Sequence, residues 1–117
     1  MHPMKKMFGF TTRETYLEYK EDWKQRYAAA SAEIRQSALA VKSAQQGLAP
    51  YSHLCSLHWQ DFQRVGTETK NAWGAAEKEL YAARNNHDKL KRAAGTLLQE
   101  RWASKEEAGR QWEEQRI

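Results

Sequence analysis

The sequence has few residues that break helices or cross-link a fold. Among its 117 residues are two prolines, six glycines and one cysteine. A protein rich in β-strands needs many turns, which proline and glycine usually supply, so this composition favours an all-α protein. Cys55 has no second cysteine to pair with, which excludes an internal disulfide and favours a reducing cytoplasm.

Long apolar runs and a dominant charge are also lacking. No stretch of about 18 apolar residues occurs, so we expect no membrane-spanning helix. The opening MHPMKKMFGF lacks the apolar core of a secretory signal. The 19 basic and 15 acidic residues are mixed along the chain and leave a net charge of +4. We therefore expect a cytoplasmic protein that does not bind membranes and has no basic tail for nucleic acid.

What the sequence does contain is one long helical pattern at residues 11–46. Thr11 and Glu14 form the T-x-x-E pattern of a capping box, which predicts the start of the helix. Gly47 and Pro50 predict its end, because glycine favours the C-terminal cap and proline cannot continue a helix. Such a helix is roughly 50 Å long. It predicts an elongated molecule.

The core positions of this helix follow a heptad. Polar Lys20 and Ser37 fill two of its slots, and the others hold apolar or small residues: Tyr16, Trp23, Tyr27, Ala30, Ile34, Val41, Ala44 and Leu48. The aromatic residues come first, which predicts a wide packing layer near Trp23 and a closer approach near Ala38–Ala44. The alternative is that the aromatic residues form an exposed surface for a partner.

The rest of the chain repeats the helical pattern with weaker boundaries. We expect helices at 52–84 and 87–114, with Asn85 and Asn86 as the interruption, since asparagine favours turns. No proline follows Pro50, so the two helices could equally be continuous across this point and across Gly66 and Gly95. The expected core stripe of the last helix is Leu90, Ala94, Leu97, Leu98, Trp102, Ala108 and Trp112.

These patterns predict an all-α fold with a single domain over 1–117, in which 1–10 form a flexible lead-in. The arrangement is an elongated antiparallel helical hairpin or a three-helix bundle, with coiled-coil-like packing. A hairpin with a long second arm would leave an apolar stripe uncovered. A homodimer would then bury that stripe.

No constellation of residues points to catalysis. His53, Cys55 and His58 are metal-type ligands, but structural zinc needs four ligands, and the two histidines would face different sides of a helix. Cys55 and His58 also have the types of a nucleophile pair, without a third group to orient them. The carboxylates alternate with Lys and Arg, which is typical of a solvated helix face. We therefore expect a non-enzymatic protein with no catalytic residues, no metal site and no cofactor.

Tryptophan is the strongest signal for a binding surface. Five tryptophans is a high number for this length, and tryptophan is enriched in the hot spots of protein interfaces. Trp59, Trp102 and Trp112 are the candidate anchors for a protein partner, within a rim of charged residues.

A second candidate surface is basic. Arg84, Lys89, Lys91 and Arg92 form a local excess of positive charge opposed by Asp88. Such a cluster could contact the phosphates of a nucleic acid. Acidic residues are nearly as numerous over the whole chain, so we expect a protein partner ahead of a nucleic acid.

Two stretches, YLEYKEDWKQRYAAASAEIR from Tyr16 and the closing RAAGTLLQERWASKEEAGRQW, resemble uncharacterised small helical proteins of bacteriophages and prophages. The closing pattern is Leu-Leu-x-x-Arg followed by Lys-x-x-Ala-x-x-Gln, formed here by Leu97, Leu98, Arg101, Lys105, Ala108 and Gln111. The resemblance implies an accessory protein that binds and inhibits a host macromolecule in the bacterial cytoplasm. The implied target is a defence complex, as for anti-CRISPR proteins. A nucleic-acid-binding accessory protein and a self-associating assembly factor are the alternatives.

Overall fold

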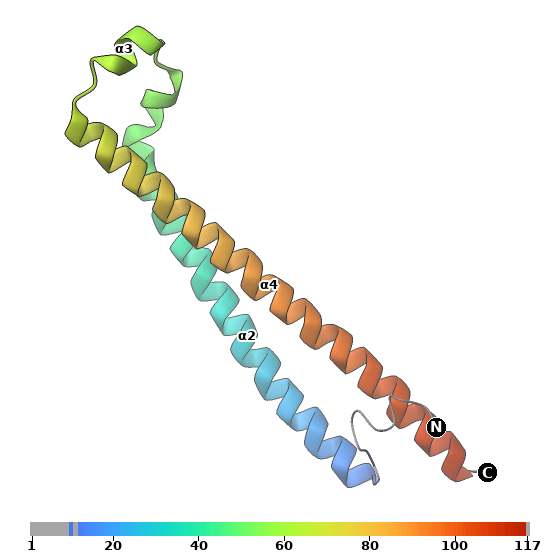
Figure 1. Ribbon diagram of the computed structural model, residues 1–117. Helices are drawn as coiled ribbons and strands as arrows, with labels where there is room; N and C mark the ends of the chain where they lie inside the picture. Colours follow the sequence, from blue (N-terminus) through green and yellow to red (C-terminus); the bar gives the residue numbers. More distant parts are fainter. Residues whose placement is uncertain (1–9, 11, 117) are drawn as a thin grey trace. The chain divides into compact units, whose positions relative to one another are not determined.

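The chain folds as a hairpin of two long α-helices. The computed structural model describes Phe10 and residues 12–116, and the side chains up to residue 110. Its elements, in order, are α2 (Arg13–Leu48), the 3-10 helix η1 (Ala49–Ser56), α3 (Trp59–Gln63) and α4 (Thr67–Arg116). Figure 1 shows α2 and α4 as antiparallel arms joined by a segment that contains α3. The all-α prediction is confirmed, and no strand occurs in this part of the chain.

The second arm is one continuous helix. Asn85, Asn86 and Gly95 all lie inside α4, so the structure shows the hairpin and not the three-helix bundle. A glycine inside a helix costs about 1 kcal/mol relative to alanine, which the packing of a long helix can offset. Gly66 is the residue just before α4 and marks its beginning.

Residues 52–66, where the sequence predicts the start of a long helix, instead form the connection between the arms. Pro50 lies in the first turn of η1. Leu57 and His58 then adopt extended backbone angles, and the short α3 follows. The reversal between the antiparallel arms therefore takes up residues 49–66 and not only a short turn at residues 47–52.

The start of α2 differs from the prediction by one residue. Thr12, and not Thr11, precedes the helix, and its partner is Thr15, not Glu14. The Thr15 N–H donates to the Thr12 hydroxyl at 3.2 Å, and the Thr12 N–H donates to the Thr15 hydroxyl at 3.2 Å. This is the reciprocal arrangement of a capping box, with threonine in place of glutamate. Thr11 lies outside the described residues.

The predicted heptad of α2 is confirmed by burial. Each of its positions is buried or half-buried, including the polar slots at Lys20 and Ser37. On α4, the equivalent positions alternate three and four residues apart: Trp73, Ala76, Leu80, Ala83, His87, Leu90, Ala94, Leu97, Arg101, Ser104 and Ala108. We call these two rows of residues the seam.

The prediction for the end of this seam was wrong at two positions. Leu98 and Trp102 are exposed, and Arg101 and Ser104 take the core slots. The reason is helical phase, because Leu97 is followed by Arg101 and Ser104 at steps of four and three. Trp112 lies in α4, but its side chain is outside the described residues.

The chain divides into two compact units, to which both long helices contribute. The terminal unit comprises Met1–Ala32 and Lys91–Ile117, and the connector unit comprises Glu33–Leu90. In the connector unit the buried residues are Ser37, Ala44, Leu54 and Leu80. Phe62 of α3 packs edge-on against Trp73 of α4, with ring centroids 5.6 Å apart.

Candidate functional site

The terminal unit contains a groove between α2 and α4 with a volume of about 620 Å³. This is within the size range of ligand sites in proteins. Its lining combines apolar and small residues with five basic ones, and no acidic residue of the described chain takes part. The basic residues are Arg13, Lys20, Lys24, Arg101 and Lys105, and the others are Tyr16, Leu17, Trp23, Ala108 and Gly109. We call this site the basic groove.

Arg101 is the most buried cation of the basic groove, with 9% of its surface exposed. Its Nη1 donates to the Tyr16 hydroxyl at 2.8 Å and to Ser104 Oγ at 3.2 Å. The guanidinium lies over the rings of Tyr16 and Trp23, 5.5 and 5.8 Å from their centroids. Hydroxyls and ring faces therefore hold the charge in place without neutralising it.

A buried arginine is usually paired with a carboxylate, because desolvating an isolated charge is costly. Among the described side chains, none forms a salt bridge with Arg101. Glu100 is its neighbour in sequence, but the Glu100 carboxylate is engaged elsewhere. The Tyr19 hydroxyl donates to it at 2.7 Å, and Arg26 Nη2 lies 3.0 Å from it. Glu100 therefore does not neutralise the charge of Arg101.

Tyr19, Arg26 and Glu100 form a cluster of hydrogen-bonded groups whose pKa values shift away from neutrality. Burial, together with the hydrogen bond to Glu100, raises the pKa of Tyr19 to about 12. Burial alone would raise the pKa of Glu100, but the hydrogen bonds from Tyr19 and Arg26 outweigh it and hold that pKa below its ordinary value. The Glu100 hydrogen bond also raises the pKa of Arg26. These groups stabilise the unit and are not tuned for proton transfer at neutral pH.

The aromatic residues beside Arg101 pack within the unit. Trp23 Nε1 donates to the Leu97 carbonyl at 2.7 Å, which ties α2 to α4. Its ring stacks on Tyr27 with centroids 5.0 Å apart, and Phe10 packs edge-on against Tyr16 at 5.3 Å. The prediction that these aromatic residues pack in the core is confirmed for Tyr16, whereas Trp23 is half-buried and also lines the basic groove. Their rings are held by the protein's own side chains.

Two of the tryptophan anchors predicted from the sequence, Trp59 and Trp102, belong to different units. Trp59 is the first residue of α3 in the connector unit and is 72% exposed. Trp102 belongs to α4 in the terminal unit and is 67% exposed. Leu98 lies one turn before Trp102 and is also exposed, so the pair forms a small apolar patch on α4.

The predicted basic cluster is spread over both units. Arg84 and Lys89 belong to the connector unit, Lys91 and Arg92 belong to the terminal unit, and all are exposed. Five residues of an α-helix turn by roughly 140°, so Arg84 and Lys89 project from different sides of α4.

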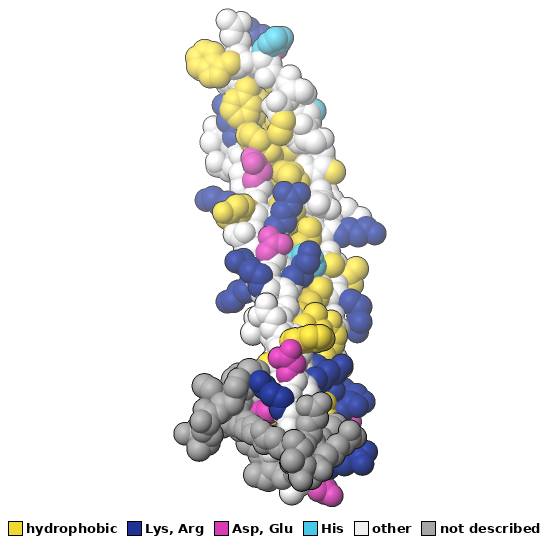
Figure 2. Space-filling model, turned by 90° about the vertical axis from the view of Figure 1, so that its right-hand side faces the viewer, with side chains coloured by type: hydrophobic (Ala, Val, Ile, Leu, Met, Phe, Trp, Pro, Cys, Tyr) yellow, Lys and Arg dark blue, Asp and Glu magenta, His cyan; other side chains and the backbone are white. Residues whose placement is uncertain are grey.

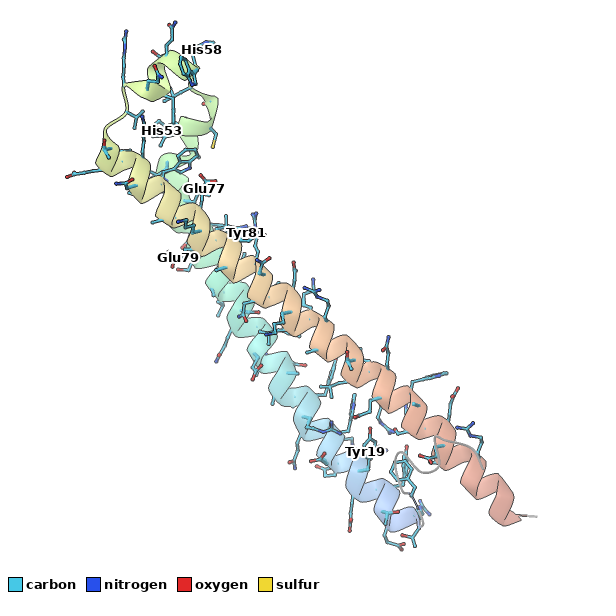
Figure 3. The ribbon with its side chains drawn as sticks, viewed as in Figure 1. Tyr19, His53, His58, Glu77, Glu79 and Tyr81 are labelled. Carbon is cyan, nitrogen blue, oxygen red and sulfur yellow. The ribbon has the colours of Figure 1, made fainter. Side chains whose placement is uncertain are left out.

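Arg84 instead borders a second groove of about 480 Å³ in the connector unit. The other residues that line it are Leu48, Glu77, Lys78, Leu80 and Tyr81. Figure 3 shows Glu77 and Tyr81 on one side of α4 and Glu79 on the other. This groove carries both signs of charge, with Glu77 set against Lys78 and Arg84, whereas the lining of the basic groove is basic only.

The metal-type residues of the connection are separated. His53 and Cys55 lie on η1, whereas His58 precedes α3 (Figure 3), and all three side chains are exposed. No group of three His, Cys, Asp or Glu side chains suited to a metal ion occurs in the described chain.

Sequence reasoning missed the basic groove, although part of its signal was present. Arg13, Lys20 and Lys24 are spaced by seven and four residues, which places them along one face of α2. The phase of the α4 heptad likewise assigns Arg101 to the seam. The basic residues of α2 lie opposite Arg101 because of the register in which the antiparallel helices pair. The spacing of residues within either helix does not predict this register.

Among the residues that the structure describes, no helix combines the length and apolar character needed to cross a membrane. A scan against protein-family models and searches of curated proteins and of solved structures each find no match to this chain.

Proposed function

We propose that this chain is a non-enzymatic accessory protein, of the phage type that its sequence resembles, which binds a host macromolecule and inhibits it. The target class that we propose is a bacterial defence complex such as CRISPR-Cas. The observation that carries the proposal is the exposure of large aromatic side chains. Trp59, Trp102 and Tyr81 each expose at least two thirds of their surface.

Exposed aromatic residues on helices are costly to leave in water. Burying a large apolar side chain stabilises a protein by about 1.5–3 kcal/mol, and the fold does not use this gain at Trp102. The patch of Leu98 and Trp102 has exposed Lys105 and Glu106 one turn further along α4. An apolar centre with charged neighbours is the composition of a protein-binding hot spot. Figure 2 shows hydrophobic side chains between Lys and Arg side chains on the face that it displays.

The proposal is tested by capture and by inhibition. The tagged full chain, treated with nuclease, should retain a host protein from a lysate of a CRISPR-positive bacterium. Its expression in a CRISPR-immune host should restore plaque formation by the targeted phage. Trp102→Ala should weaken both effects by about tenfold or more, since hot-spot truncations cost 2 kcal/mol or more. Gln99→Ala, an exposed position three residues earlier on the same helix, is the matched control.

Two results would contradict this function. One is a Trp102→Ala, Trp59→Ala double variant that captures and inhibits as well as the wild type. The other is capture that disappears with nuclease treatment, which would indicate binding through nucleic acid.

Self-association is the second candidate, and exposed leucines favour it. Leu39 on α2 is 67% exposed, and Leu17 on the same helix is also exposed. A second copy that covered these residues would give an assembly factor instead of an inhibitor. Sedimentation over a range of concentrations tests this, because a monomer at every concentration would exclude it.

A further inference from the structure

We propose that the basic groove is the receptor for a short acidic segment of the partner protein, with one carboxylate of that segment bound to Arg101. The inference rests on the proposed function, because it names the chemistry of the partner at a surface next to Trp102. Lys105 connects the two sites, since it lines the basic groove and lies three residues after Trp102 on α4.

The first argument is the charge of Arg101. Arg101 is nine-tenths buried, and its guanidinium is held by two hydroxyls and two rings, with no carboxylate from the described chain. An arginine fork binds a carboxylate through two parallel hydrogen bonds, which is the strongest neutralising contact available to it. A carboxylate that entered the basic groove would supply the missing counter-charge.

The second argument is length. The basic residues of α2 extend from Arg13 to Lys24, which is about 16 Å along the helix. An extended peptide of about five residues covers the same distance. Lys20 and Lys24 on one side and Lys105 on the other could then pair with acidic residues that flank the bound carboxylate.

The third argument favours a protein segment over a nucleic acid. Single-stranded nucleic acids bind by stacking bases on aromatic rings, but Trp23 already stacks on Tyr27 and lies under Arg101. Acidic side chains also occur on α2 between the basic ones: Glu14, Glu18 and Glu21 are all exposed. These carboxylates repel any anion that lies along α2, so a short segment that alternates acidic with apolar residues fits the Tyr16, Leu17 and Trp23 lining better than a continuous phosphate backbone.

The test uses the full chain and a short fluorescein-labelled peptide of alternating Glu and Leu, with binding followed by anisotropy. The same peptide with Gln in place of Glu keeps the shape and removes the charge. A labelled oligothymidylate tests the nucleic-acid alternative. We expect the Glu peptide to bind, the Gln peptide to bind about tenfold or more weakly, and the oligonucleotide to bind more weakly than the Glu peptide.

Variants of the protein test whether the peptide binds in the basic groove or is attracted by positive charge anywhere on α2. Lys20→Gln with Lys24→Gln should weaken binding of the Glu peptide by about tenfold or more. Lys42→Gln with Arg35→Gln removes the same charge from exposed positions of α2 that do not line the basic groove, and should leave binding unchanged. Arg101→Met should abolish binding, and its circular dichroism must match the wild type. If it does not fold, the Lys20 and Lys24 variant decides the matter.

Several results would overturn the inference: no binding of the Glu peptide, equal binding of the Gln peptide, or equal loss in the control variant. Tighter binding of the oligonucleotide, lost in the Lys20 and Lys24 variant, would assign the basic groove to nucleic acid. A concentration-dependent oligomer that this variant abolishes would assign it to a second copy of the chain.

The outcome also separates this inference from the proposed function. If the Lys20 and Lys24 variant still captures the host protein while Trp102→Ala does not, the inhibitor function stands and the basic groove has no part in it. If the Glu peptide binds as expected but no host protein is captured and phage growth is not restored, the basic groove is a receptor and the inhibitor function fails.

Discussion

The terminal and connector units are built on the same two helices but fill their seams in different ways. In the terminal unit, the ring of Trp23 and the buried cation Arg101 occupy the seam, with cross-helix hydrogen bonds from side chains. In the connector unit, small and aliphatic residues such as Ala44 and Leu80 are buried. The heptad therefore determines which positions face the opposite helix. The residue types at these positions determine whether the seam is apolar throughout or also contains a charged side chain.

Each unit also contains a polar link between the helices. In the connector unit, Ser37 Oγ donates to the Ile34 carbonyl and lies 2.7 Å from His87 Nδ1. The serine hydroxyl has a single hydrogen, so which of Ser37 and His87 donates in this link depends on the tautomer of His87. The terminal unit has a charged link beside its seam, where Arg26 and Tyr19 bind Glu100. The comparison predicts that the units respond differently to mutation and to pH.

The largest effect is expected in the apolar seam. Leu80→Ala should lower the free energy of unfolding by about 2–4 kcal/mol, because it removes a buried side chain and leaves a cavity. Leu39→Ala makes the same chemical change at an exposed position and should have little effect. Urea unfolding measures both. Equal losses would show that Leu80 does not form the core of the connector unit.

Arg101 tests whether the terminal seam depends on charge or on packing. Arg101→Ala should lower the free energy of unfolding by about 2 kcal/mol, since it removes the aliphatic stem and leaves two hydroxyls without their donor. Arg101→Met keeps the stem, so we expect it to lose less than half of that, because a buried charge contributes little net stability. Denaturant curves of the two variants settle the point. A methionine variant as unstable as the alanine variant would mean that charge, and not packing, stabilises this seam.

Acid titration should affect the terminal unit through Glu100. Its pKa in the folded protein is below the ordinary value near 4.5, so the stability that it contributes is present above that value. This stability is lost as the pH falls through the lowered pKa. Glu100→Gln should flatten this part of the curve of unfolding free energy against pH. Glu18→Gln makes the same chemical change at an exposed position on α2 of the same unit and is the matched control.

The smallest effect is expected at high pH. The pKa of Tyr19 is raised from 10.0 to about 12, so the stability linked to its protonated form is present below pH 10 and is lost as the pH rises through about 12. The tyrosinate absorbance of the wild type should contain a component that titrates near 12. Tyr19→Phe should remove that component. A titration curve that lacks it in the wild type would contradict the buried hydrogen bond to Glu100.

The sequence predicts the first helix well because its heptad is built from apolar and small residues. The same heptad in α4 contains the polar residues Arg101 and Ser104. The prediction assigned the core positions to the apolar residues Leu98 and Trp102 instead, because it followed residue type and not the helical spacing. The connection could not be predicted in detail, because Pro50 indicates where α2 ends but not how the chain turns.

The basic groove depends on information that a single sequence does not supply. Its α2 residues and its α4 residues are about eighty positions apart in the chain, as for Lys20 and Arg101. They meet because the antiparallel helices pair in one register. A shift of one heptad would preserve every hydrophobic pattern in the sequence and would place other residues opposite Arg101. The site could therefore not be predicted from the sequence, because the hydrophobic pattern does not determine the register of the two helices.

Cys55 gives the protein a natural point of attachment. It is the one cysteine of the sequence, its side chain is exposed on η1, and it lines none of the grooves described above. A maleimide dye or a surface tether would therefore modify each molecule at a single known place, without engineering. The chain could be immobilised through its connection for single-molecule or surface-based binding measurements.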